Sequence, residues 1–238
     1  MRLLLLHPLG SDGRCWDEVA ARLDGVETLA MDLPGHGTAA CLPRGAGIGV
    51  FADTVAEALA GERVHVAGLS LGGLVAQELA ARHPALVERV VLADTVDVYP
   101  EPMRQMWRER ASVARDRGLA ELAEPMAAMW FTDAFRAGGS RTPERIRELF
   151  LAMDPEGYAR ACEALEAADT TALVPAIKAP ALVVCGSADL PPFTEAARRL
   201  HGELRRSELV WMAGAKHAAA LERPAEFAAA VRAFLTAA

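Results

Sequence analysis

No stretch of this sequence is long and apolar enough to be a membrane span, which needs about 20 apolar residues. The N-terminal run Leu3–Leu6 is the nearest to a secretory signal, but His7 and Pro8 interrupt it after four leucines. The apolar part of a signal peptide needs about 7 to 15 residues and a small-residue cleavage site. We therefore expect a soluble, cytoplasmic protein with no membrane partner.

Cysteine pairs and an excess of basic charge are also missing. The four cysteines, Cys15, Cys41, Cys162 and Cys185, are widely spaced and form no C-x-x-C motif. This spacing suggests reduced thiols and neither a zinc site nor a redox dithiol, so we expect no metal and no organic cofactor. The net charge of −7 and the pI near 5.4 argue against a nucleic-acid partner, which would require a basic face. The oligomeric state is left open.

Internal repeats, linkers and low-complexity segments are absent, and 238 residues with 52% hydrophobic content suit one domain. Short apolar runs alternate with helical patterns, which is typical of a parallel sheet covered by helices on both faces. We therefore expect an α/β fold with a mostly parallel, doubly wound sheet. The expected strands are Arg2–Leu6, Glu27–Asp32, Arg63–Ala67, Val90–Ala93, Ala181–Cys185 and Glu208–Met212, and the expected helices around them are Cys15–Leu23, Phe51–Ala60, Leu74–Arg82 and Pro224–Leu235.

The sequence Gly68-Leu69-Ser70-Leu71-Gly72 lies between a strand pattern and a helical pattern. A G-x-S-x-G motif in this context is typical of the nucleophile elbow of the α/β-hydrolase fold, a strained turn that exposes the serine hydroxyl. The amides at the start of the following helix favour negative charge on an attacked carbonyl. We therefore predict that Ser70 is a nucleophile.

A serine nucleophile needs a histidine base, and usually a carboxylate that fixes the tautomer of that histidine. The order along the chain in this fold is serine, acid, histidine. His217 follows the last expected strand, so we predict that it is the base. His65 lies in a strand, and His83 and His201 end helices, so each has a structural or surface explanation.

Asp189 follows the strand Ala181–Cys185, and we predict that it orients His217. Asp94 follows the preceding strand and is the alternative, which we interpret instead as a surface or helix-capping aspartate. Asp32 and His36 lie in a turn with two glycines. We interpret His36 as a side chain that holds neighbouring loops together and not as the base.

Acyl transfer needs two hydrogen-bond donors for the developing oxyanion. In this fold one donor is the backbone amide after the nucleophile, here Leu71, and the other comes from the loop after an earlier strand. That loop is His7-Pro8-Leu9-Gly10. Because Pro8 has no N–H, we assign the second donor to Leu9.

Between residues 98 and 176 the strand pattern disappears and helical patterns take over. The expected helices are Glu101–Arg117, Leu119–Trp130, Pro143–Met153 and Pro155–Ala167. We interpret 98–176 as a helical cap inserted into a core formed by 1–97 and 177–238, making a water-poor pocket above Ser70. We predict that Trp130, Phe131 and Tyr158 line this pocket. Arg136 and Arg160 could pair with a substrate carboxylate, but we interpret both as surface residues.

With these residues the chain resembles the α/β-hydrolases, and among them most the 3-oxoadipate enol-lactonases of aromatic degradation. The resemblance runs through nearly the whole chain, and its segments are His7–Asp12 followed by Trp16, Leu33–Gly37, Gly68–Gly73, Trp130–Arg136 and Gly157–Ala159. It implies a hydrolase of a small ester or lactone. The chain departs from the family in Leu190-Pro191-Pro192, where a threonine usually precedes the prolines, and in lacking one or two strands before Arg2, which implies a trimmed sheet edge.

Other functions on the same fold stay open at this point. The same three side chains serve carbon–carbon bond hydrolases, thioesterases, cofactor-free haloperoxidases and biosynthetic acyl transferases or cyclases, because cap side chains choose the substrate. A ligand sensor that has kept the hydrolase frame is the alternative from outside enzymology. A serine at position 70 argues against epoxide hydrolases and haloalkane dehalogenases, which use an aspartate there.

Overall fold

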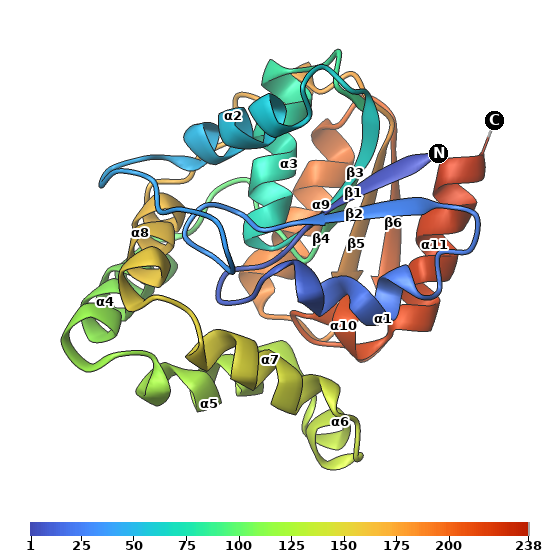
Figure 1. The fold of residues 1–238 in the computed structure, drawn as a ribbon. Coiled ribbons are helices and arrows are strands. Elements are labelled where there is room, and N and C mark those ends of the chain that lie inside the picture. Colours follow the sequence, from blue (N-terminus) through green and yellow to red (C-terminus); the bar gives the residue numbers. More distant parts are fainter. Residues whose placement is uncertain (238) are drawn as a thin grey trace.

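Six parallel strands form the centre of the computed structural model, which describes residues 1–237 (Figure 1). Their order across the sheet is β2-β1-β3-β4-β5-β6, so β2 and β6 form its edges. Each neighbouring pair is parallel, which confirms the predicted sheet. The strands are β1 (Arg2–Leu6), β2 (Glu27–Met31), β3 (Val64–Leu69), β4 (Val87–Ala93), β5 (Ala181–Gly186) and β6 (Ser207–Met212).

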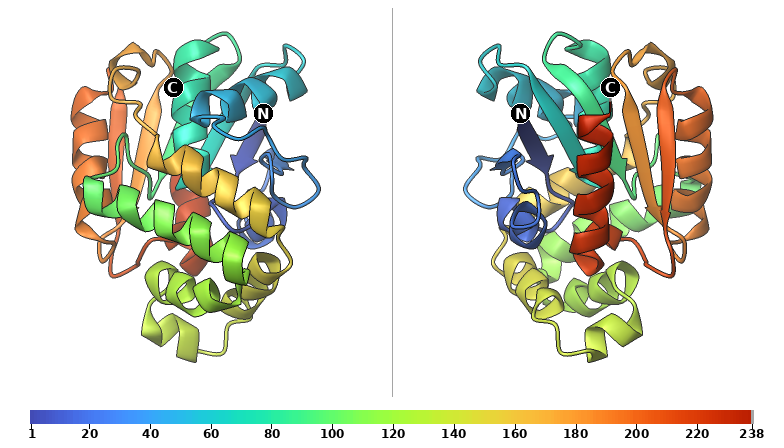
Figure 2. Two further views of the ribbon diagram at one scale, coloured as in Figure 1. Left: turned by 90° about the vertical axis from the view of Figure 1, so that its left-hand side faces the viewer. Right: turned by 90° about the vertical axis from the view of Figure 1, so that its right-hand side faces the viewer.

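Helices cover both faces of this sheet (Figures 1 and 2). One face carries α2 (Ile48–Ala58), α3 (Leu71–Arg82) and α9 (Pro191–Glu203), and the other carries α1 (Asp17–Ala20) and α11 (Pro224–Thr236). The connections contain the short helices η1 (Gly13–Trp16), η2 (Val174–Ala176) and α10 (Ala219–Glu222). Because both faces are covered, the interior strands β3 and β5 are buried along their whole length, and apart from His65 their residues are apolar.

A second group of helices separates β4 from β5 in the sequence. It comprises α4 (Glu101–Arg117), α5 (Ala120–Trp130), α6 (Asp133–Ala137), α7 (Thr142–Leu151) and α8 (Pro155–Glu166). These helices gather beyond the carboxyl ends of the strands, with α4 packed on α8 and α5 packed on α7 (Figures 1 and 2). We call residues 98–176 the helical insertion.

The two ends of the helical insertion meet at its base. Val98 and Asp169 form an isolated antiparallel bridge. Beside it, Gln77 of α3 is fully buried; its amide nitrogen donates to the carbonyl of Val96 at 2.9 Å, and its amide oxygen accepts from the hydroxyl of Thr170 at 2.7 Å. One core side chain therefore ties both ends of the insertion to the helix that follows Ser70.

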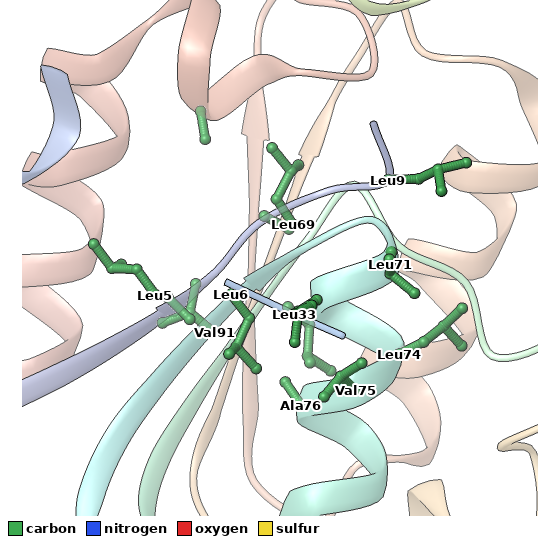
Figure 3. Close-up of a cluster of buried hydrophobic side chains, with 14 of the residues drawn as sticks. Leu5, Leu6, Leu9, Leu33, Leu69, Leu71, Leu74, Val75, Ala76 and Val91 are labelled. Atoms are coloured by element: carbon green, nitrogen blue, oxygen red, sulfur yellow. The ribbon is translucent and has the colours of Figure 1, made fainter. Parts of the chain in front are cut away.

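Leucine and valine side chains from β1, β3, β4 and α3 form a buried cluster beside Ser70 (Figure 3). Leu6, Leu69 and Leu74 are fully buried members of this cluster. Fully burying one such side chain stabilises the fold by about 1.5–3 kcal/mol, so the elbow rests on a rigid support. In the described residues no helix has the length and apolar character needed to span a membrane.

Candidate active site

Ser70 lies between β3 and α3 in a strained backbone conformation, with φ +54° and ψ −110°. A non-glycine residue with positive φ costs about 1–3 kcal/mol and persists where its surroundings hold it. Here the Ser70 amide donates to the carbonyl of Ala93 at 2.9 Å, and the hydroxyl of Thr95 donates to the carbonyl of Ser70 at 2.8 Å. The turn therefore has the geometry of the predicted elbow.

The glycines on either side of Ser70 allow the strand and the helix to approach closely. A Cβ atom on Gly68 would lie 2.1 Å from the carbonyl oxygen of Gly72, and one on Gly72 would lie 2.2 Å from that of Leu6. Both distances are far inside van der Waals contact with backbone atoms, which cannot move aside as a flexible side chain can. The motif thus needs glycine at both positions for a steric reason.

Ser70, His217 and Asp189 form one chain of hydrogen bonds, although they come from three separate parts of the sequence. Nε2 of His217 lies 2.9 Å from Oγ of Ser70, and Nδ1 lies 2.9 Å from Oδ2 of Asp189. All three residues are at least 92% buried, and the ring of Phe193 packs on that of His217 with centroids 4.1 Å apart. Because a carboxylate accepts from Nδ1–H, Nε2 is left to accept the serine proton.

Asp94 has a different role from Asp189. It is fully buried, with φ +42°, and its carboxyl accepts from the amides of Gly186 at 2.7 Å and Ala219 at 3.2 Å. Burial, and then the charge of Asp189, raise the pKa of Asp94 well above its usual value. The interpretation of Asp94 as a surface residue is wrong, because this carboxyl joins β5 to the start of α10 inside the protein; the capping interpretation holds for its bond to Ala219.

The loop after β1 places Leu9 at the same site. Leu9 borders the same cavity as Ser70, and within residues 1–237 its amide has no hydrogen-bond acceptor. The amide of Leu71 is the first of α3, so it has no acceptor within the helix. His7 holds the loop: its Nδ1–H donates to the carbonyl of Pro8 at 2.9 Å, and its Nε2 accepts from the amide of Leu33 at 2.8 Å.

His36 and Asp32 bind loop groups and not Ser70 or His217. Nδ1 of His36 donates to the carbonyl of Pro34 at 3.1 Å, and burial lowers the pKa of His36 to about 3, so its ring is neutral. Asp32 accepts from the amides of Gly13 and Thr38, each at 2.9 Å. This geometry agrees with the interpretation of His36 as a side chain that holds loops.

A narrow cavity lies over Ser70 and His217, with the helical insertion forming most of its wall. The other lining residues are Leu9, Trp107, Arg110, Met126, Met129, Trp130 and Tyr158. They leave about 10 Å³ open, which is room for about one water molecule. The unbranched side chains of Met126 and Met129 are the adaptable part of this wall.

The residues predicted to line the pocket divide into two kinds. Trp130 and Tyr158 do line the cavity. Phe131 does not; it is fully buried behind the wall, with its ring centroid 5.4 Å from that of Phe135 and 6.2 Å from that of Trp130.

Arg136 and Arg160 are both outside the cavity lining. Arg136 forms an ion pair with Glu124. Arg160 donates to Glu156 at 2.9 Å and to the carbonyl of Leu42 at 2.5 Å. Both arginines therefore have protein partners, and neither is among the residues that line the cavity over Ser70.

The family model described as "Alpha/beta hydrolase family" matches residues 3–230 of this chain. The chain belongs to the alpha/beta hydrolase family. This match spans both the sheet and the helical insertion, so the whole architecture described above is that of the family. The six-stranded parallel sheet and the turn at Ser70 are the structural features that agree with this family membership.

Individual alpha/beta hydrolases resemble this chain along nearly its full length. It is 29% identical over 238 residues to 3-oxoadipate enol-lactonase 2 of Acinetobacter baylyi, covering 98% of this chain and 88% of that protein. It is 31% identical over 240 residues to a pimeloyl-[acyl-carrier protein] methyl ester esterase of Chromobacterium violaceum, covering 96% and 92%. The crystal structure of the enol-lactonase from Burkholderia xenovorans LB400 superimposes with a TM-score of 0.93 at 33% identity, covering 99% and 91%. These relatives are hydrolases of esters and lactones by name.

Trp107, Arg110 and the two methionines of this alpha/beta hydrolase site were not predicted from the sequence. Trp107 and Arg110 are three residues apart on α4, so they share one helix face with the buried Ala111 and Ala114. That spacing is a signal for one buried face. It does not say which part of the core the face meets, so it could not connect α4 with Ser70.

One cluster of metal-ligand types occurs in the described residues, formed by Asp94, Cys185 and Asp189. Their ligand atoms lie within 4.8 Å of one another, and all three residues are buried. Asp189 is already bonded to His217, and Asp94 to two backbone amides. Burial raises the pKa of the Cys185 thiol, which disfavours the thiolate that a metal requires, so this cluster is explained by the hydrogen bonds it makes.

Proposed function

We propose that this protein is a serine hydrolase that cleaves a small ester or lactone through an acyl-enzyme. The observation that carries the proposal is the hydrogen-bond chain from Ser70 through His217 to Asp189, with both distances at 2.9 Å and Ser70 held at positive φ. A structural serine would need neither the strained turn nor a buried histidine oriented by a buried carboxylate.

In the proposed mechanism Oγ of Ser70 attacks the carbonyl carbon while Nε2 of His217 takes the hydroxyl proton. The amides of Leu9 and Leu71 donate to the oxyanion of the tetrahedral intermediate. His217 then gives its proton to the departing alcohol, or to the ring oxygen of a lactone, and the acyl-enzyme remains. Water attacks this ester, His217 takes the water's proton and returns it to Ser70, and the acid is released. Asp189 stabilises the imidazolium in both halves.

We further propose that the helical insertion 98–176 acts as a cap on the core formed by 1–97 and 177–238. The narrowness of the cavity supports this role, because a cap that excludes water strengthens the electrostatic interactions beneath it. Trp130 and Tyr158 would contact the substrate, and Phe131 would support Trp130 from behind. The cavity has to widen for a substrate to enter.

3-Oxoadipate enol-lactone is the first substrate to test. The similarity to the Acinetobacter and Burkholderia enol-lactonases supports it, as does the resemblance of the segments Trp130–Arg136 and Gly157–Ala159 to that family. A carboxylic methyl ester is the second candidate, favoured by the 31% identity to a methyl ester esterase over 96% of the chain.

The experiment that tests the proposal compares hydrolysis of freshly generated 3-oxoadipate enol-lactone with that of a short-chain p-nitrophenyl ester, using wild type and Ser70→Ala. Serine-dependent turnover of the lactone supports both the mechanism and the substrate. Serine-dependent cleavage of the p-nitrophenyl ester alone keeps the mechanism and rejects the lactone. Retained hydrolysis by purified Ser70→Ala rejects the mechanism, and stoichiometric labelling of Ser70 by a fluorophosphonate without turnover favours a sensor.

A further inference from the structure

Arg110 is the one arginine in the wall of the cavity over Ser70, and no carboxylate of the described residues lines that wall. The side chain is half-buried, and its guanidinium lies over the indole ring of Trp107, 5.4 Å from the centroid. The remaining wall is mainly aromatic, aliphatic and thioether. The positively charged side chain of Arg110 therefore lines the same mostly apolar cavity as Ser70.

Arg110 lacks the carboxylate partners that neighbouring arginines of α4 have. Arg108 pairs with Glu101 and Glu166, and Arg115 pairs with two further glutamates. Within residues 1–237, Arg110 forms no ion pair with a carboxylate, and its one side-chain hydrogen bond is to the hydroxyl of Tyr158 at 3.5 Å. Most of the donor capacity of the guanidinium is thus unused by the protein.

Trp107, a residue of the same wall, also has a hydrogen-bond donor without a partner. The indole N–H of Trp107 is buried and has no acceptor among the described residues. A buried donor without an acceptor is costly, so a native structure that keeps one at a cavity wall needs an explanation. A bound molecule with a hydrogen-bond acceptor would give this N–H its missing partner. If the acceptor were a carboxylate, it would also neutralise the charge of Arg110.

We propose that Arg110 is a specificity-determining residue that binds a free carboxylate on the acyl part of the substrate, with the Trp107 N–H as a second donor. The inference rests on the hydrolase function proposed above. It assigns the substrate to the esters or lactones of dicarboxylic acids: Ser70 attacks one end, the apolar wall formed by Leu9, Met126 and Met129 packs on the methylene chain, and Arg110 holds the other end.

Two methyl esters with equal five-carbon acyl chains test this assignment. Monomethyl glutarate ends in a carboxylate and methyl pentanoate ends in a methyl group, and proton release measures kcat/KM for both. The variants are Arg110→Gln, Arg110→Lys and, as a matched control on the same helix, Arg108→Gln. We expect wild type to prefer monomethyl glutarate and Arg110→Gln to lose at least about tenfold on this ester, while its rate on methyl pentanoate changes by less than about threefold.

Arg110→Lys should retain part of the preference, because lysine keeps the charge without the planar fork, and Arg108→Gln should change neither rate. Equal losses on both esters in Arg110→Gln, or no loss on either, would overturn the proposal. If wild type cleaves neither ester, the hydrolase function fails for such esters, and calorimetry with glutarate then decides the inference. Weaker glutarate binding by Arg110→Gln than by wild type supports it; equal binding, or none by wild type, overturns it.

Discussion

Two buried aspartates at neighbouring strand ends show how the surroundings of a residue decide its chemistry. Asp189 faces a histidine ring that can carry positive charge, whereas Asp94 faces two backbone amides and a second carboxylate. The sequence could rank these two candidates for the acid, because Asp189 follows β5 and His217 follows the neighbouring strand β6. It could not show that Asp94 is fully buried, since its contacts come from β5 and α10.

Substituting each aspartate with asparagine separates their roles. We expect Asp189→Asn to lower kcat on any substrate by about 10²–10⁴-fold, because the amide no longer fixes the required tautomer of His217. Asp94→Asn should stay within about tenfold of wild type, since Asp94 makes no hydrogen bond to His217. Steady-state kinetics with circular dichroism as the folding control measures both, and equal losses would show that the acid is wrongly assigned.

The raised pKa of Asp94 also predicts a pH dependence of stability. In the unfolded chain the pKa of an aspartate is about 3.9. In the folded protein the pKa of Asp94 lies well above this ordinary value. Between the two values the folded state binds more protons, so the contribution of Asp94 to stability is full below the unfolded pKa and is lost as pH rises through the folded pKa. The stability advantage of wild type over Asp94→Asn in urea unfolding should therefore shrink as the pH rises above the unfolded pKa and through the raised folded pKa. An advantage that grows over this range would contradict the assigned direction.

The residues of the cavity wall mark the limit of prediction from the sequence. Ser70, His217 and Asp189 could be predicted because strand ends in a parallel sheet meet at one edge, so their place follows from chain order alone. Trp107 and Trp130 lie on helices and Phe131 directly follows α5, and the directions of these side chains depend on how the helices pack. Aromatic composition therefore could not distinguish Phe131, behind the wall, from Trp107, within it.

At the scale of the element, most of the predicted strands and long helices match the observed bounds to within a few residues. β1 and α4 coincide with their predicted ranges, Arg2–Leu6 and Glu101–Arg117. The predicted helix Cys15–Leu23 is divided into η1 and the short α1, because the side chain of Asp12 accepts from the amide of Arg14 and caps a 3₁₀ turn.

The short helices α6 and α10 escaped prediction, because tertiary contacts stabilise them. The carboxyl of Asp94 accepts from the first amide of α10. The hydroxyl of Thr132 caps α6 and also donates to Glu222, which lies 90 residues further along the chain. The Thr132 cap is a local signal, but the bonds of Asp94 to α10 and of Thr132 to Glu222 have no signature in the local sequence.

The junction of β3 and α3 provides a test of backbone packing. We expect Gly72→Ala to destabilise the protein by about 1–3 kcal/mol or more, because the added Cβ would lie 2.2 Å from the carbonyl oxygen of Leu6. Gly202→Ala is the control: it lies in α9 with no atom within 4 Å of the added Cβ, and it should stabilise by about 0.5–1 kcal/mol. Urea unfolding of both variants measures the contrast, and a well-tolerated Gly72→Ala would refute the close approach.

At the scale of the whole molecule, the base of the helical insertion is held by a bridge between its own two ends and by hydrogen bonds from one core side chain. Val98 and Asp169 form the bridge, and the side chain of Gln77 makes one hydrogen bond with Val96 and one with Thr170. Gln77 lies on the helix that starts at Ser70. Any rotation of α3 would therefore disturb the serine and the attachment of the insertion together.

Gln77→Leu tests this attachment with a side chain of similar size. We expect a loss of stability of about 1–3 kcal/mol, because the carbonyl of Val96 loses its side-chain donor and the hydroxyl of Thr170 loses one of its two acceptors. We also expect faster proteolysis within 98–176. Gln105→Leu, at an exposed position of α4, should leave both unchanged. Urea unfolding and limited trypsin digestion provide the measurements, and unchanged digestion of folded Gln77→Leu would show that the attachment lies elsewhere.

The bridge between Val98 and Asp169 brings the two ends of the insertion together, and this matters for how the insertion can be replaced. Because its two ends leave the core at one point, the spacing of β4 and β5 does not depend on how many residues lie between Val98 and Asp169. Recombination at this point would exchange most of the wall of the cavity over Ser70 in one step, while Ser70, His217 and Asp189 stay in place. New specificities can thus arise here by replacing one contiguous stretch of chain.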